Sequence, residues 1–234
     1  MIDIHCHILN GIDDGPTYIQ ESIEMARVAA ADGVSKIIAT PHLNHKIYPV
    51  KEIHKRVDQL NNQLEKLQIP VEIFPGADVS AHVDISLLKD FTLNQSQYLL
   101  TEFPHTHLPR ATKELLFKLK INGFLPIITH PERNLSLIKN PDLLLQLLDD
   151  NVFVQITANS LTGKFGSKVK KCATYLLKKG AVNFIASDAH SSNHRRPVLS
   201  KGLQIAEKII GKNEAAKLVS ANPEAVIAAK PLSR

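Results

Sequence analysis

Seven short apolar segments recur along the 234 residues, and most are followed by a loop and then by a segment with helical spacing. The apolar segments are continuous rather than alternating, which is typical of strands buried on both faces of a parallel sheet. A chain built this way belongs to the α/β class. The predicted strands cover residues 1–5, 34–40, 71–77, 97–102, 125–129, 152–157 and 182–187.

The segments between the predicted strands carry apolar residues at helical spacing. The stripe over residues 50–67 is ended by Pro70, and Thr17 with Gln20 forms a predicted capping box for the first helix. Residues 79–94 give the weakest helical pattern. We expect helices over residues 17–32, 50–67, 112–122, 141–150, 167–179 and 199–210, followed by a short C-terminal pair.

Alternating strands and helices give either an open doubly wound sheet or a closed barrel. Histidines or carboxylates follow six of the seven predicted strands. Side chains from so many strands meet at one point only where the strand ends form a ring, as in a barrel with its site at the carboxyl ends. We therefore predict a single domain over residues 1–234, with the α/β fold of a distorted seven-stranded (β/α)7, TIM-like barrel.

The first and last predicted strands each deliver a pair of candidate metal ligands. His5 and His7 lie on one face of a strand, about 6–7 Å apart, so both reach one ion. Asp188 and His190 have the same spacing. Neutral imidazole together with carboxylate suits Zn, Mn or Fe. Further candidates at strand ends are His42, Glu102, His130 and one carboxylate of the Asp13-Asp14 pair, a segment that also has the composition of a turn.

The two cysteines, Cys6 and Cys172, are too few for a disulfide framework and indicate a reducing compartment, so we expect a cytoplasmic protein. Cys6 points to the opposite face of its strand from its two histidine neighbours, so we expect it to pack in the core. A cysteine phosphatase needs an arginine six positions after its cysteine. Ile12 and Lys178 stand at those positions, which disfavours thiol catalysis.

Charge and composition exclude several other classes of protein. The net charge of +5 is mild, and the lysines are scattered over predicted helices as on solvated helix faces. The chain has no tryptophan and few aromatic residues, so we expect no nucleic-acid partner that is read by base stacking. The sequence opens with the first predicted strand and shows no basic stretch followed by an apolar one, so we expect no signal peptide. No apolar run approaches the roughly 20 residues of a membrane helix. We expect no membrane insertion.

Six short motifs stand in order along nearly the whole chain: residues 2–7 (IDIHCH), 13–16 (DDGP), 39–42 (ATPH), 101–104 (TEFP), 129–133 (THPER) and 186–190 (ASDAH). Together they resemble the polymerase-and-histidinol-phosphatase (PHP) superfamily. More narrowly, they resemble the manganese-dependent bacterial protein-tyrosine phosphatases encoded with capsule and exopolysaccharide genes. The resemblance implies a seven-stranded (β/α) barrel with two or three metal ions, Mn²⁺ first among them and Fe or Zn as alternatives.

The resemblance also implies which residues hold the ions. In the family, a glutamate after the third strand bridges two of the ions, and Asp78 stands at that position in this chain. Because Asp is one methylene shorter than Glu, bridging requires the backbone to lie closer to the ions. The expected sets are His5, His7 and Asp188 for one ion; Glu102 and His130 for a second, bridged to the first by Asp78; and Asp14, His42 and His190 for a third.

Divalent ions activate a bridging water for in-line attack on a phosphoryl group, and the substrate dianion calls for arginine. Arg133 and Arg195 match the family's phosphate-binding arginines, which implies catalytic and substrate-binding roles for both. Arg110 is a weaker substrate-binding candidate at the rim. Loop histidines expected on the same face are His105, His107 and His194, whereas His45, His54 and His82 are expected at the surface.

The function that the resemblance implies is hydrolysis of phosphotyrosine on a protein. The implied partner is the tail of a tyrosine kinase that controls polysaccharide synthesis and export. The chain has no long insertion to form a lid, which favours an open site and a protein substrate. Two alternatives remain: a small-molecule phosphomonoesterase of the histidinol phosphate or nucleotide type, and a catalytically weakened regulatory homologue, which only Asp78 favours.

Overall fold

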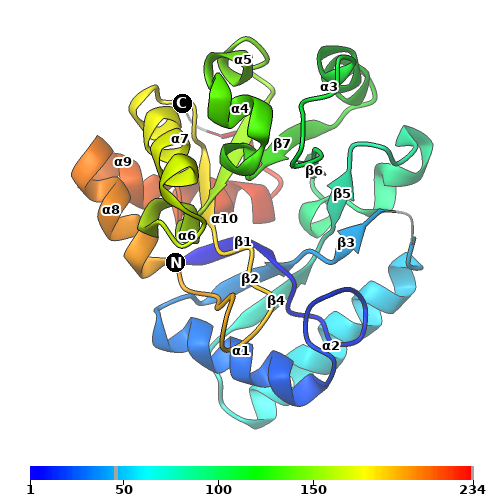
Figure 1. Ribbon diagram of the computed structural model, residues 1–234. Helices are drawn as coiled ribbons and strands as arrows, with labels where there is room; N and C mark the ends of the chain where they lie inside the picture. Colours follow the sequence, from blue (N-terminus) through cyan, green and yellow to red (C-terminus); the bar gives the residue numbers. More distant parts are fainter. Residues whose placement is uncertain (45–46, 233–234) are drawn as a thin grey trace.

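The computed structural model describes residues 1–44 and 47–232, and within them it contains nine strands, β1 (Ile2–Cys6), β2 (Lys36–Ala39), β3 (His42–Leu43), β4 (Glu72–Pro75), β5 (Asp78–Ser80), β6 (Tyr98–Glu102), β7 (Leu125–Thr129), β8 (Phe153–Thr157) and β9 (Phe184–Ala186). They form two sheets, with the orders β1-β2-β4 and β3-β5-β6-β7-β8-β9 (Figure 1). Every strand pair is parallel. The prediction of an α/β fold with parallel strands is confirmed.

The second and third predicted strands are each broken into two. β2 and β3 are separated at Pro41, which has no N–H to donate to a neighbouring strand. β4 and β5 are separated at Gly76. A Cβ there would lie 2.8 Å from Ile38 and 2.9 Å from Leu93, so a larger residue would displace its neighbours where the chain passes from one sheet to the other.

The prediction of one closed seven-stranded barrel is not met by the hydrogen bonds of the described residues, which form two separate sheets. The breaks at β2/β3 and β4/β5 divide the strands between them. At the other side, β1 meets the residues after β9. The Asp188 N–H donates to the His5 carbonyl at 2.8 Å, and the His7 N–H donates to the Ala189 carbonyl at 2.8 Å. Strand ends from both sheets are thereby brought around one interior.

The interior near the amino ends of the strands is apolar. Tyr98, which is almost fully buried, donates its hydroxyl to the Lys230 carbonyl at 2.9 Å. The Asn94 side-chain amide donates to the Ile227 carbonyl at 3.0 Å, so helix α10 (Ala221–Ile227) and the residues after it cover this end. The buried cluster consists of Ile2, Ile4, Ile38, Leu93, Tyr98, Leu100, Ile127, Phe153, Phe184, Ala186 and Val226.

Helices pack against the outer faces of both sheets (Figure 1). The predicted capping box is wrong, because the first helix begins at Ile19 and its cap residue Tyr18 makes no side-chain cap. The weak segment 79–94 forms no α-helix: it begins in β5 and continues into two 3₁₀ turns, η1 (Ile85–Asp90) and η2 (Leu93–Gln95). The α-helices before α10 are α1 (Ile19–Ala31), α2 (Val50–Lys66), α3 (Thr112–Ile121), α4 (Leu135–Lys139), α5 (Asp142–Leu145), α6 (Ala158–Thr162), α7 (Ser167–Lys178), α8 (Ser200–Ile210) and α9 (Lys212–Lys217).

None of the helices in the described residues combines the length and the apolar character that crossing a membrane requires. The longest, α2, has 17 residues and buries one face through Ile53, Val57, Leu60 and Leu64.

Candidate metal centre

An irregularity in the register of β1 accompanies the turn of His5, in the strand, and His7, just after it, into the interior. The register of β1 against β2 shifts between Asp3 and Cys6, and β-bulges re-aim side chains next to functional sites. The Asp3 carboxylate accepts the His5 N–H at 3.3 Å and the Ser187 N–H at 3.0 Å, which holds this part of β1 against the loop after β9. His5 and His7 face the same interior as the apolar residues that precede them.

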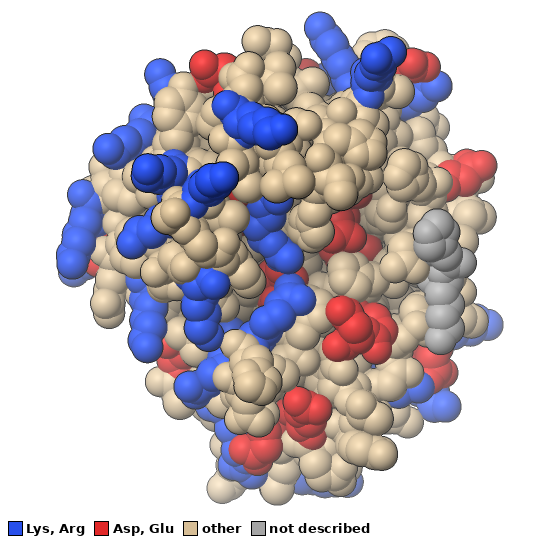
Figure 2. Space-filling model, viewed as in Figure 1, with Lys and Arg blue, Asp and Glu red and all other residues tan. Residues whose placement is uncertain are grey.

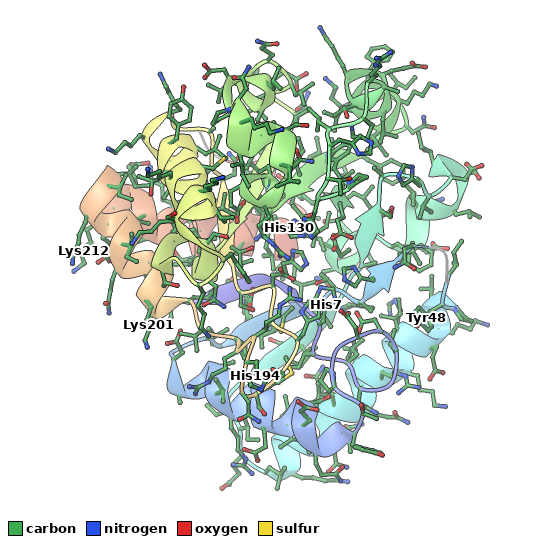
Figure 3. The ribbon with its side chains drawn as sticks, viewed as in Figure 1. His7, Tyr48, His130, His194, Lys201 and Lys212 are labelled. Atoms are coloured by element: carbon green, nitrogen blue, oxygen red, sulfur yellow. The ribbon has the colours of Figure 1, made fainter. Side chains whose placement is uncertain are left out.

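All nine predicted metal ligands belong to overlapping groups of His, Asp and Glu side chains. Within each group, one possible ligand atom per residue lies within 4.8 Å of all the others. The groups lie near the centre of the face shown in Figure 3, where His7 and His130 are labelled. They are His5, His7 and Asp188; His5, Asp78 and His130; Glu102, His105 and His130; His42, Asp78 and Glu102; and His7, Asp14, His42 and His190.

Asp78 lies between two of these groups. It is the first residue of β5, and the register of β5 against β3 sets it beside His42. Its Oδ2 atom lies 3.6 Å from His5 Nε2 and 3.3 Å from His42 Nδ1, and its side chain is fully buried. A carboxylate that serves two ions needs such a position, so the shorter side chain still reaches both groups.

The neighbours Asp13 and Asp14 occupy different places. Asp13 Oδ2 lies 2.6 Å from His7 Nδ1 and accepts the His42 N–H at 3.0 Å. Asp14 Oδ1 lies 3.3 Å from His190 Nε2 and 3.7 Å from His42 Nε2. Asp13 therefore fixes the orientation of an imidazole from behind, as outer carboxylates do in metal sites, while Asp14 faces the cluster.

Gly15 allows this loop to lie against β1. A Cβ at Gly15 would stand 2.3 Å from the His7 carbonyl oxygen, a backbone atom that cannot rotate away. Any side chain there would push the loop off the strand and withdraw both carboxylates. The DDGP motif thus combines two acidic groups with the one residue that lets them approach.

The Asp188 carboxylate is shared between the histidines and two arginines. Its Oδ1 atom lies 3.6 Å from Nε2 of both His5 and His7. Its Oδ2 atom pairs with Arg133, and with Arg195 at 2.6 Å. The two guanidinium groups therefore meet at the edge of the ligand cluster, where they can present paired N–H donors to an anion bound beside it.

Two of the clustered residues have strained backbones. His130, after β7, has φ +32°, and Asp188, after β9, has φ +50°; this left-handed region is unfavourable for residues with a Cβ. Each such residue costs on the order of 1–3 kcal/mol and persists only where its surroundings hold it. The conformation turns the chain sharply at the strand end and directs each side chain into the cluster.

Burial and charge shift the pKa values of the clustered groups in opposite directions. Burial, reinforced by the neighbouring histidines His190, His42 and His5, lowers the pKa of His7 well below its usual range, so its imidazole is neutral as a metal ligand must be. For His42, burial is outweighed by the carboxylates of Asp78 and Glu102, which raise the pKa to about 11. The two carboxylates lie 3.3 Å and 3.4 Å from His42 Nδ1.

The donor set fits divalent metal ions. Burial leaves several polar atoms of the cluster without a hydrogen bond: both oxygens of Asp78, Nδ1 of His42 and Nε2 of His190. Buried polar groups without partners are rare and call for an explanation such as an ion. Imidazole nitrogens and carboxylate oxygens converge on the same points, which is the ligand chemistry of Mn, Fe or Zn sites.

The remaining predicted residues lie outside the cluster, with one exception. His105 is exposed but belongs to a group with Glu102 and His130, and its Nε2 lies 3.5 Å from Arg133 Nη2. Arg110 is exposed, and no ion pair joins it to the described residues of the cluster. Of the other histidines, His82, His107 and His194 are exposed and His54 is half-buried, while His45 lies outside the described residues.

Several supporting residues were missed in the sequence. Gln155 Oε1 lies 3.0 Å from His5 Nδ1, which leaves His5 Nε2 facing the carboxylates. Glu132 is fully buried and accepts the Thr157 N–H at 2.8 Å and the Ser160 hydroxyl at 2.6 Å, which anchors the turn after His130. Gln155 lies in, and Glu132 lies beside, a predicted strand that is expected to be buried on both faces. A polar residue at such a position is unusual, and this could have indicated a supporting role in the site.

Comparison with known proteins supplies a family for this arrangement. The chain matches the family described as "Capsular polysaccharide synthesis, CpsB/CapC" over residues 1–228. It is 38% identical over 233 residues to tyrosine-protein phosphatase YwqE of Bacillus subtilis, with 97% of this chain and 91% of that protein covered. It is 36% identical over 211 residues to the putative tyrosine-protein phosphatase CapC of Staphylococcus aureus, with 87% and 82% covered.

A solved structure agrees with these sequence matches. It comes from the crystal structures of YwqE from Bacillus subtilis and CpsB from Streptococcus pneumoniae, described as unique metal-dependent tyrosine phosphatases. The TM-score is 0.91 at 36% identity, and all of both chains is covered. The likeness therefore includes the parts of the chain that carry the histidine and carboxylate cluster.

Proposed function

The chain belongs to the CpsB/CapC family of capsular polysaccharide synthesis proteins, and we propose that the cluster of histidines and carboxylates is its active site. Its activity is that of a metal-dependent protein-tyrosine phosphatase. We propose further that residues 1–234 form a single domain, in which the two sheets together enclose the active site as a distorted seven-stranded barrel.

One observation carries this proposal. The Asp188 carboxylate faces the imidazoles of His5 and His7 with one oxygen and the guanidinium groups of Arg133 and Arg195 with the other. A set of metal ligands and a pair of anion-binding arginines thus share one edge. A phosphoryl group bound there would contact cations on two sides, which is the arrangement that stabilises charge during phosphoryl transfer.

The proposed ions are Mn²⁺, with Fe or Zn as alternatives, in a number of two or three per chain. When bound, such ions lower the pKa of a coordinated water toward neutrality and polarise the phosphoryl oxygens. Asp78 lies where it can serve two of them. The proposed ligands are His5, His7 and Asp188 for one ion, Glu102 and His130 for the second, and Asp14, His42 and His190 for the third.

The two arginines bind and orient the substrate. Each guanidinium offers N–H donors in a plane that match two oxygens of a phosphoryl group. Arg133 is held in place by Phe165, whose ring centroid lies 4.8 Å from the guanidinium carbon. Arg195 is positioned by its own backbone, whose carbonyl accepts the His190 N–H at 2.9 Å. Arg110 is at most a rim contact for a protein substrate, because it is exposed and forms no ion pair with the described residues of the cluster.

The proposed substrate is a phosphotyrosine-containing protein, and the proposed partner is the tail of a polysaccharide-export tyrosine kinase in the cytoplasm. Family membership in capsular polysaccharide synthesis supports this partner. Both cysteines are buried and unpaired, which agrees with a reducing compartment. The leaving group is a phenol with a pKa of about 10, so phosphotyrosine makes little demand on a protein acid.

Two measurements on the purified protein test this function. Extensive dialysis against a chelator should abolish turnover of a phosphotyrosine peptide, and added Mn²⁺ should restore it, with two or three ions per chain found by elemental analysis. Full turnover in demonstrably metal-free protein would refute the metal mechanism.

The second measurement separates this function from the alternatives. Phosphotyrosine peptides should be hydrolysed with higher kcat/KM than histidinol phosphate or nucleoside monophosphates. The reverse order would identify a small-molecule phosphatase, and binding of phosphopeptide without turnover in the Mn²⁺-loaded protein would identify a regulatory homologue.

A further inference from the structure

A cavity of about 520 Å³ lies beside the candidate active site, where the end of α1, helix α6 and the start of α8 meet. None of the nine proposed metal ligands lines it. Three cationic side chains do: Lys164 from the loop after α6, Arg196 from the loop before α8, and Lys201 from the first turn of α8. All three are exposed, so their charged ends are accessible from solvent.

The positive charge of this cavity is not balanced within the described residues. Of the described residues that line it, Asp32 alone is acidic, and its carboxylate is engaged at the start of α8. It accepts the Leu199 N–H at 2.7 Å, the Ser200 N–H at 2.9 Å and the Ser200 hydroxyl at 2.5 Å. Arg196 and Lys201 form no ion pair with the described carboxylates, and Lys164 donates only to the His194 carbonyl, at 3.1 Å.

Two chain segments connect this cavity to the arginine pair. Phe165 packs on Arg133, and the preceding residue, Lys164, lines the cavity. Arg195 pairs with Asp188, and the following residue, Arg196, lines the cavity. In each segment, one residue belongs to the active site and its neighbour to the cavity. The cavity and the arginine pair are therefore linked through directly bonded residues, Lys164–Phe165 and Arg195–Arg196.

Figure 2 shows the same asymmetry on the surface: Lys and Arg gather on the left, over α6 to α8, and reach the rim of the central hollow, while Asp and Glu lie in the hollow and to its right. Figure 3 places Lys201 on this basic side, and Lys212 further out on α9.

We propose that the cavity lined by Lys164, Arg196 and Lys201 is an anion subsite that binds an acidic residue or a second phosphorylated residue of the substrate peptide, a few positions from the phosphotyrosine being hydrolysed. This inference rests on the proposed phosphatase function. The subsite selects peptides by charge and leaves the chemical step unchanged, because no described metal ligand lines the cavity or forms an ion pair with its three cations. Exposed charges of this kind act mainly on binding and weaken with salt.

The test compares two phosphotyrosine peptides, one with glutamates and one with alanines at two to four positions on both sides of the phosphotyrosine. The parent enzyme should hydrolyse the acidic peptide with about tenfold higher kcat/KM, through a lower KM. Lys201→Glu should reduce the preference to less than twofold. A non-hydrolysable phosphonate version of each peptide should give the same ranking by fluorescence anisotropy, which measures binding without turnover.

Lys212→Glu is the matched control, because Lys212 is also an exposed lysine in the first turn of a helix but does not line the cavity. It should keep the tenfold preference. Turnover of para-nitrophenyl phosphate, which carries no flanking residues, should be equal within twofold in all three proteins.

The outcomes are distinct. Equal kcat/KM for both peptides in the parent would overturn the subsite, as would an equal loss of preference in Lys212→Glu, which would indicate general surface attraction. Binding to phosphatidylserine vesicles is measured for the same proteins. If Lys201→Glu weakens vesicle binding and leaves the peptide preference intact, the subsite is overturned in favour of a membrane surface. Absence of para-nitrophenyl phosphate turnover in the Mn²⁺-loaded parent would instead refute the phosphatase function, and the subsite with it.

Discussion

Phe184 and Asp188 lie only four residues apart, yet they belong to opposite ends of the interior. Phe184 packs fully buried in the apolar cluster that α10 covers, while Asp188 lies among imidazoles and guanidinium groups. The same change occurs along β6, where Leu100 is in the apolar cluster and Glu102 is in a ligand group. The amino ends of the strands are built for packing and the carboxyl ends for chemistry.

The difference shows where the stability of this fold comes from. Burying apolar side chains at the amino ends lowers the free energy of the folded state, by about 25 cal/mol for each Å² removed from water. Burying carboxylates and imidazoles at the carboxyl ends raises it unless they are paired or bind metal. We therefore expect metal ions to stabilise the folded protein as well as to serve its activity, since they bind only the folded state.

The largest expected effect at the carboxyl end is that of Asp78→Ala. Among the described residues, Asp78 alone offers a carboxylate that lies in both a His5 group and a His42 group. Its removal should cost at least one metal ion and about a thousandfold in kcat/KM, since ions at both groups lose a ligand. Metal stoichiometry and phosphopeptide turnover are measured beside the parent. Asp78→Glu is the control that keeps a carboxylate and should retain metal; unchanged stoichiometry and rate in Asp78→Ala would show that Asp78 is no ligand.

At the amino end, Phe184→Ala should act on stability alone. Phe184 is fully buried in the apolar cluster, and removal of such a ring costs about 3–5 kcal/mol. Urea unfolding of the metal-free protein measures the loss. The milder Ile127→Val should cost about 0.5–1.5 kcal/mol at the same end. Both folded variants should bind as much metal as the parent, and loss of metal in Ile127→Val would show that the two ends are not independent.

Arg133→Ala and Arg195→Ala should lower activity without loss of metal. Each removes a charge-assisted contact to the phosphoryl group, worth about 2–4 kcal/mol in a desolvated site. Their kcat/KM values on a phosphotyrosine peptide are compared with that of Arg110→Ala, an exposed arginine outside the cluster. If Arg110→Ala were the most impaired of the three, the phosphate would have to bind at the rim instead.

The smallest expected effect is that of the cysteines. Burial raises the pKa of Cys172 to about 12 and that of Cys6 well above its usual range, so both thiols are protonated at neutral pH. A raised thiol pKa leaves little reactive thiolate below that value. Cys6→Ser and Cys172→Ser should each change kcat/KM less than threefold, and iodoacetamide should label the folded protein slowly. Loss of activity in Cys6→Ser with full metal content would point to a thiol nucleophile.

The sequence predicted regular segments well and interruptions poorly. The apolar run at 125–129 coincides with β7, and the predicted helix at 167–179 ends one residue from α7, because continuous burial and helical spacing are properties of whole segments. The breaks at Pro41 and Gly76, by contrast, depend on which sheet each half joins. That choice is made by contacts between residues far apart in the chain, such as Gly76 against Leu93.

The same distinction applies to the candidate site. The nine predicted ligands could be found because each follows an apolar run, and the structure brings them together. The residues that support them could not be found by position alone. The residue pattern alone does not choose between Asp13 and Asp14, and only the family resemblance selects Asp14. The role of Asp3 depends on a shift in register that no local pattern in the sequence indicates.

The left-handed backbones of His130 and Asp188 have an evolutionary consequence. Glycine adopts such a conformation without the Cβ penalty, so a lineage released from catalysis would gain stability by replacing these two residues first. This chain has a residue with a Cβ at both positions and lacks the stability that glycine would add there. The strain therefore indicates selection for these two side chains. We expect it to persist while they are needed for activity, and its loss in a descendant would indicate that the fold had lost that activity.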